Sequence, residues 1–294
     1  MEQNGIQAVL HCLPPQIRSR IQQLSAAELA QVQEIRLRAE RPVCIQIHGR
    51  EQLLQPESVL SQKAVEQVFQ AVCEYSVYRY AKEIAEGFVT IAGGNRVGIA
   101  GSAVYQEGKL VQMRHISGLN FRVSHAVTGC AESLYRRTCA RQPASLLLVG
   151  AVGSGKTTML RDLCRLLGAS HRLTLVDERS EIAAVHHGVP QYDVGLHTDV
   201  LDGFPRAEGL LTALRVMTPE VLVCDEIGTE ADAQAILRIH GCGVPVIASA
   251  GTPWEDLERR PVLRQLLEQG VFRYAAILSV QEQGVVRTLR QVTA

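Results

Sequence analysis

One short stretch constrains the fold of this 294-residue chain more than any other. It runs from Gly150 to Thr158 and reads Gly-Ala-Val-Gly-Ser-Gly-Lys-Thr-Thr, between an apolar run at 146–149 and a helical pattern at 159–167. A strand, a glycine-rich loop and a helix in this order form the context of a phosphate-binding P-loop. The glycines let the backbone curl so that successive N–H groups face phosphate oxygens, and the helix dipole adds positive charge. The stretch therefore predicts a binding site for a nucleoside triphosphate.

Two side chains near the end of this stretch have separate expected roles. Lys156 is long enough to reach the β- and γ-phosphates, and a hydroxyl in the place of Thr157 is the usual Mg²⁺ ligand of a P-loop. The whole stretch is expected to line the nucleotide: Gly150, Ala151, Val152, Gly153, Ser154, Gly155, Lys156, Thr157 and Thr158.

The second half of the chain alternates apolar runs with helical patterns. Such alternation is typical of a parallel sheet with helices on its faces. We therefore expect an α/β fold, a RecA-like P-loop NTPase domain, over residues 141–294. The expected strands are 146–149, 173–176, 221–224, 244–249, 272–280 and 285–291, and the expected helices are 159–167, 206–217, 230–241 and 255–269.

The first half predicts a smaller N-terminal α+β domain, which ends with a linker helix at residue 140. Apolar and polar residues alternate at 34–38, at 43–48 and in several runs between 88 and 125, a pattern that indicates an antiparallel sheet. Residues 61–86 have a helical pattern. This half carries no chemical motif of its own.

Two acidic pairs follow expected strands of the second half. Asp225 and Glu226 end the run at 221–224, about 70 residues after the P-loop, which is the arrangement of a Walker B motif. Asp225 is expected to hold Mg²⁺, and Glu226 can polarise a water molecule for attack on the γ-phosphate. The other pair, Asp177 and Glu178, follows the run at 173–176. Position in the sequence does not decide whether Glu178, Glu181 or Glu226 is the base.

Two further clusters could form functional sites, but a simpler interpretation is favoured for each. The tyrosines Tyr75, Tyr78 and Tyr80 could form a stacking platform, but packing in the core is favoured. The second cluster resembles a set of metal ligands, but its spacing fits no metal site, and a polar loop at 186–203 that senses nucleotide is favoured. Its members are His186, His187, Asp193, His197 and Asp199.

The composition argues against several classes of protein. The formal net charge is zero, whereas a primary nucleic-acid binder usually has a basic surplus. None of the eight cysteines forms a C-x-x-C pair, so we expect reduced, buried thiols. The N-terminus has no export signal, and no apolar run reaches the roughly 18 residues of a membrane span.

Longer blocks around these motifs resemble one protein family. The chain is similar to the stage III sporulation protein AA family, the ATPases of the channel between mother cell and forespore in endospore-forming bacteria. The resemblance covers nearly the whole chain, and the block Val-Asp-Glu-Arg-Ser-Glu-Ile at 176–182 is specific. The other matching blocks are 34–38, 93–101, 116–122, 148–158, 188–195, 198–203 and 219–228.

This resemblance implies a biological setting. The family is similar to type II and type IV secretion ATPases, which are hexameric rings that use ATP and Mg²⁺. It implies membrane-embedded sporulation channel proteins as partners of a homo-oligomeric ring. It also implies a cytoplasmic location in the mother cell, peripheral to the membrane through these partners.

The resemblance also assigns residues. A glutamate after the second strand is a candidate base in secretion ATPases, and Glu178 or Glu181 matches it. Arginines of the N-terminal domain reach the nucleotide in those proteins, and the matching residues are Arg96 and Arg122. Arg215 would lie near the Walker B strand.

The chain departs from the secretion ATPases at one position. Those proteins usually carry a histidine after the strand that matches 246–249, whereas this sequence reads Ala-Ser-Ala-Gly-Thr-Pro at 248–253. Ser249 or Thr252 could replace a γ-phosphate sensor only in part.

The favoured hypothesis is an ATP-hydrolysing motor. One alternative is a nucleotide-gated scaffold that docks on a membrane channel without hydrolysis. The other is a P-loop kinase that transfers phosphate to a small molecule.

Overall fold

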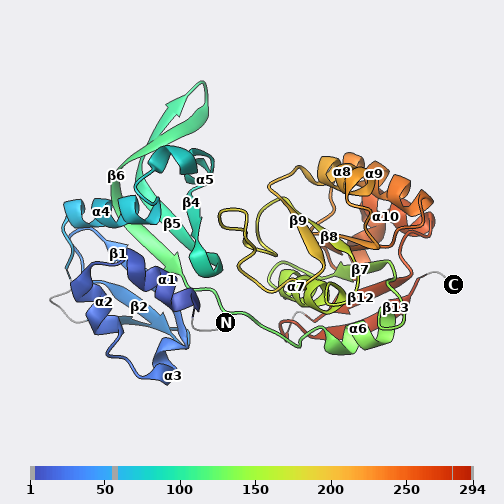
Figure 1. Cartoon of the computed structure of the whole chain (residues 1–294), viewed down its shortest axis with the longest axis horizontal. Coiled ribbons are helices and arrows are strands. Elements are labelled where there is room, and N and C mark those ends of the chain that lie inside the picture. Colours follow the sequence, from blue (N-terminus) through green and yellow to red (C-terminus); the bar gives the residue numbers. More distant parts are fainter. Residues whose placement is uncertain (1–3, 55–58, 280, 293–294) are drawn as a thin grey trace. The chain divides into compact units, whose positions relative to one another are not determined.

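The computed structural model describes residues 4–54, 59–279 and 281–292 of the chain. The chain divides into two compact units, Met1–Ala126 and Val127–Ala294 (Figure 1). Each unit is built around hydrophobic core residues of its own.

The first unit combines short helices with an antiparallel sheet. Its elements are α1 (Asn4–Cys12), α2 (Pro15–Ile21), α3 (Ala26–Leu29), β1 (Val32–Arg38), β2 (Cys44–Ile47), β3 (Arg50–Leu53), α4 (Gln62–Val72), η1 (Val77–Tyr80), α5 (Ala81–Ala85), β4 (Phe88–Ile91), η2 (Ala92–Gly94), β5 (Asn95–Gln106) and β6 (Lys109–Arg122). The strand order is β3-β2-β1-β6-β5-β4, and every neighbouring pair is antiparallel.

The period-two pattern of β1 divides the two faces of this sheet. Ile35 and Leu37 are fully buried and belong to one core cluster with Val65 and Phe69 of α4. The residues that alternate with them, Glu34, Arg36 and Arg38, are half-buried and point to the opposite face. The predicted α+β character of this half is therefore seen in the structure.

The second unit is a doubly wound α/β structure. Its elements are α6 (Glu132–Thr138), β7 (Leu146–Val149), α7 (Lys156–Leu167), β8 (Leu173–Asp177), β9 (Thr198–Asp202), α8 (Arg206–Val216), β10 (Val221–Cys224), α9 (Glu230–Gly241), β11 (Val246–Ala250), η3 (Trp254–Arg259), α10 (Pro261–Glu268), β12 (Tyr274–Leu278) and β13 (Val286–Gln291). The strand order is β13-β12-β7-β11-β10-β8-β9, and only the β12–β13 pair is antiparallel.

Both faces of this sheet are covered, which explains why its central strands are apolar without alternation. In β7, Leu146 and Leu148 belong to one core cluster, together with residues of α6 and α7. Leu147 and Val149 belong to another, together with residues of α8, α9 and α10. All four side chains of β7 are fully buried.

The boundary between the units lies earlier than the sequence indicated. Residues 127–140 were expected to close the first domain, but they belong to the second unit. Ala131 and Leu134 are buried in its core beside α7. The backbone N–H of Ala131 also donates to the buried carboxylate of Asp162 (2.8 Å). The apolar face of α6 therefore decides which unit holds it.

Two elements of the second unit differ from the sequence-based prediction. Residues 198–202, expected within a loop, form the edge strand β9, which pairs with β8. Its sequence, Thr-Asp-Val-Leu-Asp, is too short and too polar to show a strand pattern. The expected helix at 255–269 is divided into η3 and α10, because Pro261 starts a new helix.

The tyrosine cluster lies only partly in the core. Tyr80 is 4% exposed, whereas Tyr75 is 80% and Tyr78 is 94% exposed. Residues three apart share a face in the 3₁₀ helix η1, so Val77 and Tyr80 point inward and Tyr78 points outward. Core packing is thus confirmed for Tyr80 and wrong for Tyr75 and Tyr78.

The cysteines are free thiols, and Cys242 is exposed rather than buried. Burial raises the pKa of Cys73 and of Cys224 to about 12. Among the helices that the structure describes, none is both long and apolar enough to cross a membrane.

Candidate phosphate-binding site

The parallel strands of the second unit end at one edge of the sheet. The residues that follow β7, β11, β10 and β8 therefore lie along that edge, in this order. They are the loop at 150–155, Gly251, the pair Asp225–Glu226, and Glu178. The topology thus explains why motifs far apart in sequence form one candidate site.

The loop after β7 has the backbone of a P-loop. Helix α7 begins at Lys156, and Gly153 (φ 81°) and Gly155 (φ 91°) before it have left-handed backbone conformations that side chains disfavour. A Cβ on Gly150 would lie 2.5 Å from Oγ of Ser154. Glycine is therefore required at all three positions, for conformation at two and for space at the third.

The side chain of Lys156 binds back to the backbone of its own loop. Its Nζ donates to the carbonyl oxygens of Gly150 and Ala151, both at 2.9 Å. Burial lowers the pKa of Lys156, and the negative charges of Asp225 and Glu226 oppose this shift. The ammonium group is thus held inside the loop by backbone dipoles and by acidic residues that belong to the same site.

Asp225 connects the P-loop helix with two central strands. Its Oδ2 accepts a hydrogen bond from Oγ1 of Thr157 (3.2 Å). Its Oδ1 accepts hydrogen bonds from Oγ of Ser249 and from the backbone N–H of Glu226, the second at 2.9 Å. A hydroxyl and a carboxylate in contact are the oxygen ligands that Mg²⁺ takes in nucleotide sites. These residues therefore fit the metal that the sequence predicted.

Glu226 lies beside this carboxylate in an uncommon backbone conformation. Its φ is 40°, and its backbone N–H donates to Oγ of Ser249 (3.0 Å) as well as to Asp225. Gly251 leaves room for the side chain, since a Cβ there would lie 2.7 Å from Oε1 of Glu226. Arg179 pairs with the other carboxylate oxygen at 3.4 Å.

In the second acidic pair, the carboxylate of Asp177 is bound by backbone N–H groups. Asp177 is buried and accepts hydrogen bonds from the N–H groups of Glu181, Ile182 and Ala183, at 2.9, 3.0 and 2.8 Å. Burial raises the pKa of Asp177, and these three hydrogen bonds counteract the shift. Its carboxylate thus stabilises the turn after β8.

Glu178 is bound by a buried arginine. Arg206 of α8 donates to Oε2 of Glu178 (2.7 Å) and to Oδ2 of Asp232 (3.0 Å), and it is only 9% exposed. Glu181 lies in the turn capped by Asp177, and its carbonyl oxygen accepts from Arg161 (2.7 Å). Of the three candidate bases, the described contacts bring Glu226 alone into contact with Asp225.

The turn between β12 and β13 supports the P-loop, which the sequence did not reveal. The N–H of Gly284 donates to the carbonyl of Ser154 (2.9 Å), and a Cβ on Gly155 would lie 2.6 Å from this nitrogen. Oγ of Ser154 is buried without a hydrogen-bond partner in the described structure. A free buried hydroxyl in the loop is consistent with a polar ligand there.

Comparison with known proteins identifies the family of the chain. The family described as sporulation stage III, protein AA matches residues 3–292. The chain belongs to this family. Stage III sporulation protein AA of Bacillus subtilis (strain 168) is 35% identical over 286 residues, which cover 95% of this chain and 92% of that protein. Protein SEEDLING PLASTID DEVELOPMENT 1 of Arabidopsis thaliana is 32% identical over 165 residues, 52% of this chain and 22% of that protein.

The solved structures of an ATPase and of a pilus retraction motor share the fold. The Legionella pneumophila ATPase DotB gives a TM-score of 0.58 at 16% identity, with 90% of this chain and 76% of that one covered. The pilus retraction motor PilT with bound ADP gives 0.59 at 16% identity, with 84% and 74% covered. The expected RecA-like α/β fold of this family member is thereby confirmed.

The arginines expected to reach the nucleotide lie in the first unit. Arg96 of β5 and Arg122 of β6 are direct partners across the sheet. The guanidinium of Arg96 lies over the ring of Phe88, 4.8 Å from its centre. Pairing therefore brings two guanidinium-bearing residues from distant sequence positions side by side.

Arg215 does not lie at the candidate site. It is in the last turn of α8, just before the start of β10, whereas Asp225 follows the end of that strand. Its side chain donates to Oγ1 of Thr212 on the same helix (3.3 Å). Arg215 therefore lies near the Walker B strand, as the resemblance implies, but at the end of the strand opposite Asp225.

Proposed function

We propose that this chain is an ATP-hydrolysing motor of the secretion-ATPase type, which powers or gates the channel complex between mother cell and forespore. The observation that carries the proposal is the hydrogen bond between Thr157 and Asp225 (3.2 Å). It joins the helix after the P-loop to the acidic end of β10, which is the arrangement that nucleotide hydrolysis requires. Family membership and the fold of DotB and PilT support the same conclusion.

In this proposal the chain binds ATP through the P-loop. The backbone N–H groups of residues 150–155 face the phosphates, and Lys156 turns from the carbonyls of Gly150 and Ala151 to the phosphate oxygens. The Thr157 hydroxyl and the Asp225 carboxylate would hold Mg²⁺, which neutralises charge on the phosphates when bound.

Glu226 is the proposed base. It orients a water molecule and accepts its proton while the water attacks the γ-phosphate. Three observations favour it over Glu178 and Glu181: it follows Asp225 directly, Gly251 leaves space for its carboxylate, and the Arg179 side chain that pairs with it is exposed. Glu178, by contrast, is paired with the buried Arg206.

The remaining parts of the proposal come from the family. Arg96 and Arg122 would contact the phosphates of ATP and so report hydrolysis to the first unit. Subunits would form a homo-oligomeric ring, a hexamer, at the cytoplasmic face of the mother-cell membrane. Membrane-embedded channel proteins would be the partners that receive the work.

The test is ATP turnover by the full chain as a function of its concentration. We expect phosphate release that rises per subunit with concentration, because neighbours complete a ring. Lys156→Ala should abolish turnover, and its control is Lys63→Ala, which removes a lysine from α4 of the first unit. Wild-type turnover by the Lys156→Ala chain would contradict the proposal. Tight ATP binding without turnover, even with channel partners added, would favour the nucleotide-gated scaffold.

A further inference from the structure

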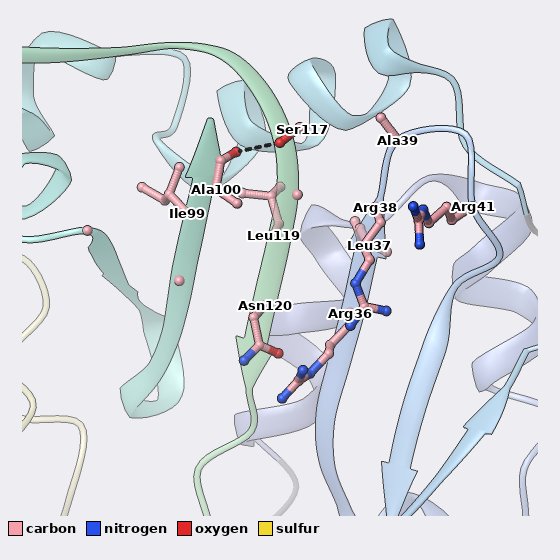
Figure 2. Close-up of a pocket in the computed structure, with 13 residues that line it drawn as sticks. Arg36, Leu37, Arg38, Ala39, Arg41, Ile99, Ala100, Ser117, Leu119 and Asn120 are labelled. Atoms are coloured by element: carbon pink, nitrogen blue, oxygen red, sulfur yellow. Dashed lines mark hydrogen bonds between the residues drawn. The ribbon is translucent and has the colours of Figure 1, made fainter. Parts of the chain in front are cut away.

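A pocket lies within the first unit, apart from the candidate phosphate-binding site of the second unit. It has a volume of about 530 Å³ and is formed by β1, the bend after it, β5 and β6 (Figure 2). It begins two residues along the strands from the pair Arg96–Arg122, where Asn120 of β6 lies between Arg36 of β1 and Gly98 of β5. A volume of this size is typical of small-molecule sites.

The pocket is basic. Arg36, Arg38 and Arg41 line one side, and Figure 2 shows them along β1 and the bend that follows it. Arg36 is paired with Glu34 at 2.5 Å, and Arg38 donates to the sulfur of Cys44 (3.4 Å). The residues that line the pocket include no acidic side chain. Positive charge therefore exceeds negative charge at the pocket.

The middle strand of the pocket, β6, carries a buried polar atom without a hydrogen-bond partner. Oδ1 of Asn120 is inaccessible to solvent and accepts no hydrogen bond in the described structure. A buried polar atom left unpaired destabilises the fold. Because this amide belongs to the lining of the pocket, rotation of its carboxamide group would present Oδ1 to a hydroxyl or amino group of a ligand.

Gly98 in the middle of β5 has no role that the protein alone explains. Its backbone conformation is not left-handed, and a Cβ would meet only Asn120, at an ordinary 3.8 Å. Elsewhere in the sheet the reason is plain, since a Cβ on Gly101 would lie 2.8 Å from the carbonyl oxygen of Arg114. Glycine inside a strand often marks the close approach of a ligand.

We propose that this pocket binds a phosphorylated small molecule of mononucleotide size. The guanidinium groups of Arg36 and Arg38 bind the phosphate through the N–H donors that Glu34 and Cys44 leave open. Asn120 binds the sugar or base, and Gly98 leaves the floor open for it. This site belongs to the first unit alone and does not depend on hydrolysis at the P-loop.

The experiment uses the full chain with Lys156→Ala, which disables the P-loop. Binding of ADP, inorganic pyrophosphate and citrate is measured by calorimetry. We expect saturable binding of ADP and pyrophosphate, one per chain. Adding Arg36→Ala and Arg38→Ala should weaken it roughly tenfold or more, since charge-assisted hydrogen bonds to the phosphate are lost.

Two further variants separate binding from folding and from net charge. Gly98→Val fills the pocket without changing charge and should abolish ADP binding. Arg50→Ala removes an exposed arginine of β3 and should leave the affinity within about twofold of that of the Lys156→Ala parent. The thermal unfolding midpoint of each chain checks its fold.

Three outcomes would overturn the proposal. The first is the absence of saturable binding to the Lys156→Ala chain. The second is binding that survives both the arginine substitutions and Gly98→Val. The third is citrate binding as tight as that of pyrophosphate, which would indicate a general anion site. Loss of ATP turnover in the Lys156→Ala chain has no bearing on any of them, so failure here is distinguishable from failure of the ATPase proposal.

Discussion

Asp225 uses both of its carboxylate oxygens inside the protein. One accepts from Thr157, and the other accepts from Ser249 and from the backbone of Glu226. These donors replace the water that a half-buried carboxylate loses, and they fix its orientation before any ligand binds. Ser249, one of the two residues considered as a partial replacement for a γ-phosphate sensor, donates its hydroxyl to Asp225.

Glu226 and Glu178 can be separated by matched substitutions. Glu226→Gln keeps the size of the side chain but removes the proton acceptor, so we expect ATP turnover to fall about 100-fold or more with ATP affinity retained. Glu178→Gln should lower the unfolding midpoint, because Arg206 loses a charged partner, and should leave most of the turnover intact. Phosphate release, nucleotide binding and thermal unfolding are measured on both chains. The reverse pattern of turnover would move the base to Glu178.

Ionisation of Asp232 makes the stability of the fold depend on pH in the acid range. Burial raises the pKa of its carboxyl, but hydrogen bonds from Thr229 and Gly228 and the charge of Arg206 outweigh burial, so the pKa is lowered. A carboxyl whose pKa is lower in the folded chain than in the unfolded chain stabilises the fold at pH values above its unfolded pKa of about 3.9. This stabilisation is lost as the pH falls through the folded pKa. We expect Asp232→Asn to lose about 2–3 kcal/mol of unfolding free energy at pH 7.

The control for Asp232 is the same comparison in acid. Urea unfolding of wild type and Asp232→Asn at pH 7 and at pH 3 should show a smaller difference at pH 3. Below a pH of about 3.9 the unfolded chain binds a proton at this carboxyl, whereas the folded chain binds it only at lower pH. An equal difference at both values would mean that hydrogen-bond geometry, and not charge, accounts for the effect.

The P-loop and the β12–β13 turn form one structural element in the folded chain. Gly155 faces Gly284 so closely that neither backbone can move toward the other, and the N–H of Gly284 fixes the carbonyl of Ser154. Carbonyls of a P-loop must point away from the phosphates so that the N–H groups point toward them. The turn therefore orients the loop from outside.

Substitution of Gly155 tests this contact. Gly155→Ala introduces a methyl group 2.6 Å from the nitrogen of Gly284, so we expect nucleotide binding at the P-loop to be lost. Gly243→Ala is the matched control, since its φ of 77° imposes similar backbone strain with open space around the Cβ. It should lose about 1 kcal/mol of stability and keep ATP affinity. Equal effects of both on ATP affinity would show that strain, and not the contact, matters.

The two units have separate cores, so each is a candidate for independent folding. The boundary decides which fragments are stable. A fragment of residues 127–294 keeps α6, whereas a fragment of residues 141–294 exposes the surface that Ala131, Leu134 and Cys139 cover. It also removes the N–H that pairs with the buried carboxylate of Asp162.

We therefore expect the longer fragment to be more stable by about 3 kcal/mol or more, since removal of one buried leucine side chain alone costs 2–5 kcal/mol. Urea unfolding of both fragments measures the difference. A fragment of residues 122–294 controls for chain length and should match the 127–294 fragment. Equal stability of the 127–294 and 141–294 fragments would return α6 to the first domain.

Much of the fold follows from local pattern. The strand–loop–helix around Lys156, the apolar strands before Asp177 and Asp225, and the RecA-like class depend on glycine conformation and on runs of apolar residues, which are properties of neighbouring residues. Polar or short elements escaped prediction for the same reason. β9 has too few apolar residues, and the apolar face of α6 fits either neighbour until packing selects one.

The candidate site shows the same division. The residues of the P-loop and the acidic pairs were identifiable from the sequence, because each motif lies within a few consecutive residues. The contact of Ser249 with Asp225, the capture of Glu178 by Arg206 and the support of Ser154 by Gly284 were not, because they join residues 24, 28 and 130 positions apart. Such contacts depend on strand order and on the packing of buried side chains, and these are set only when the whole chain folds.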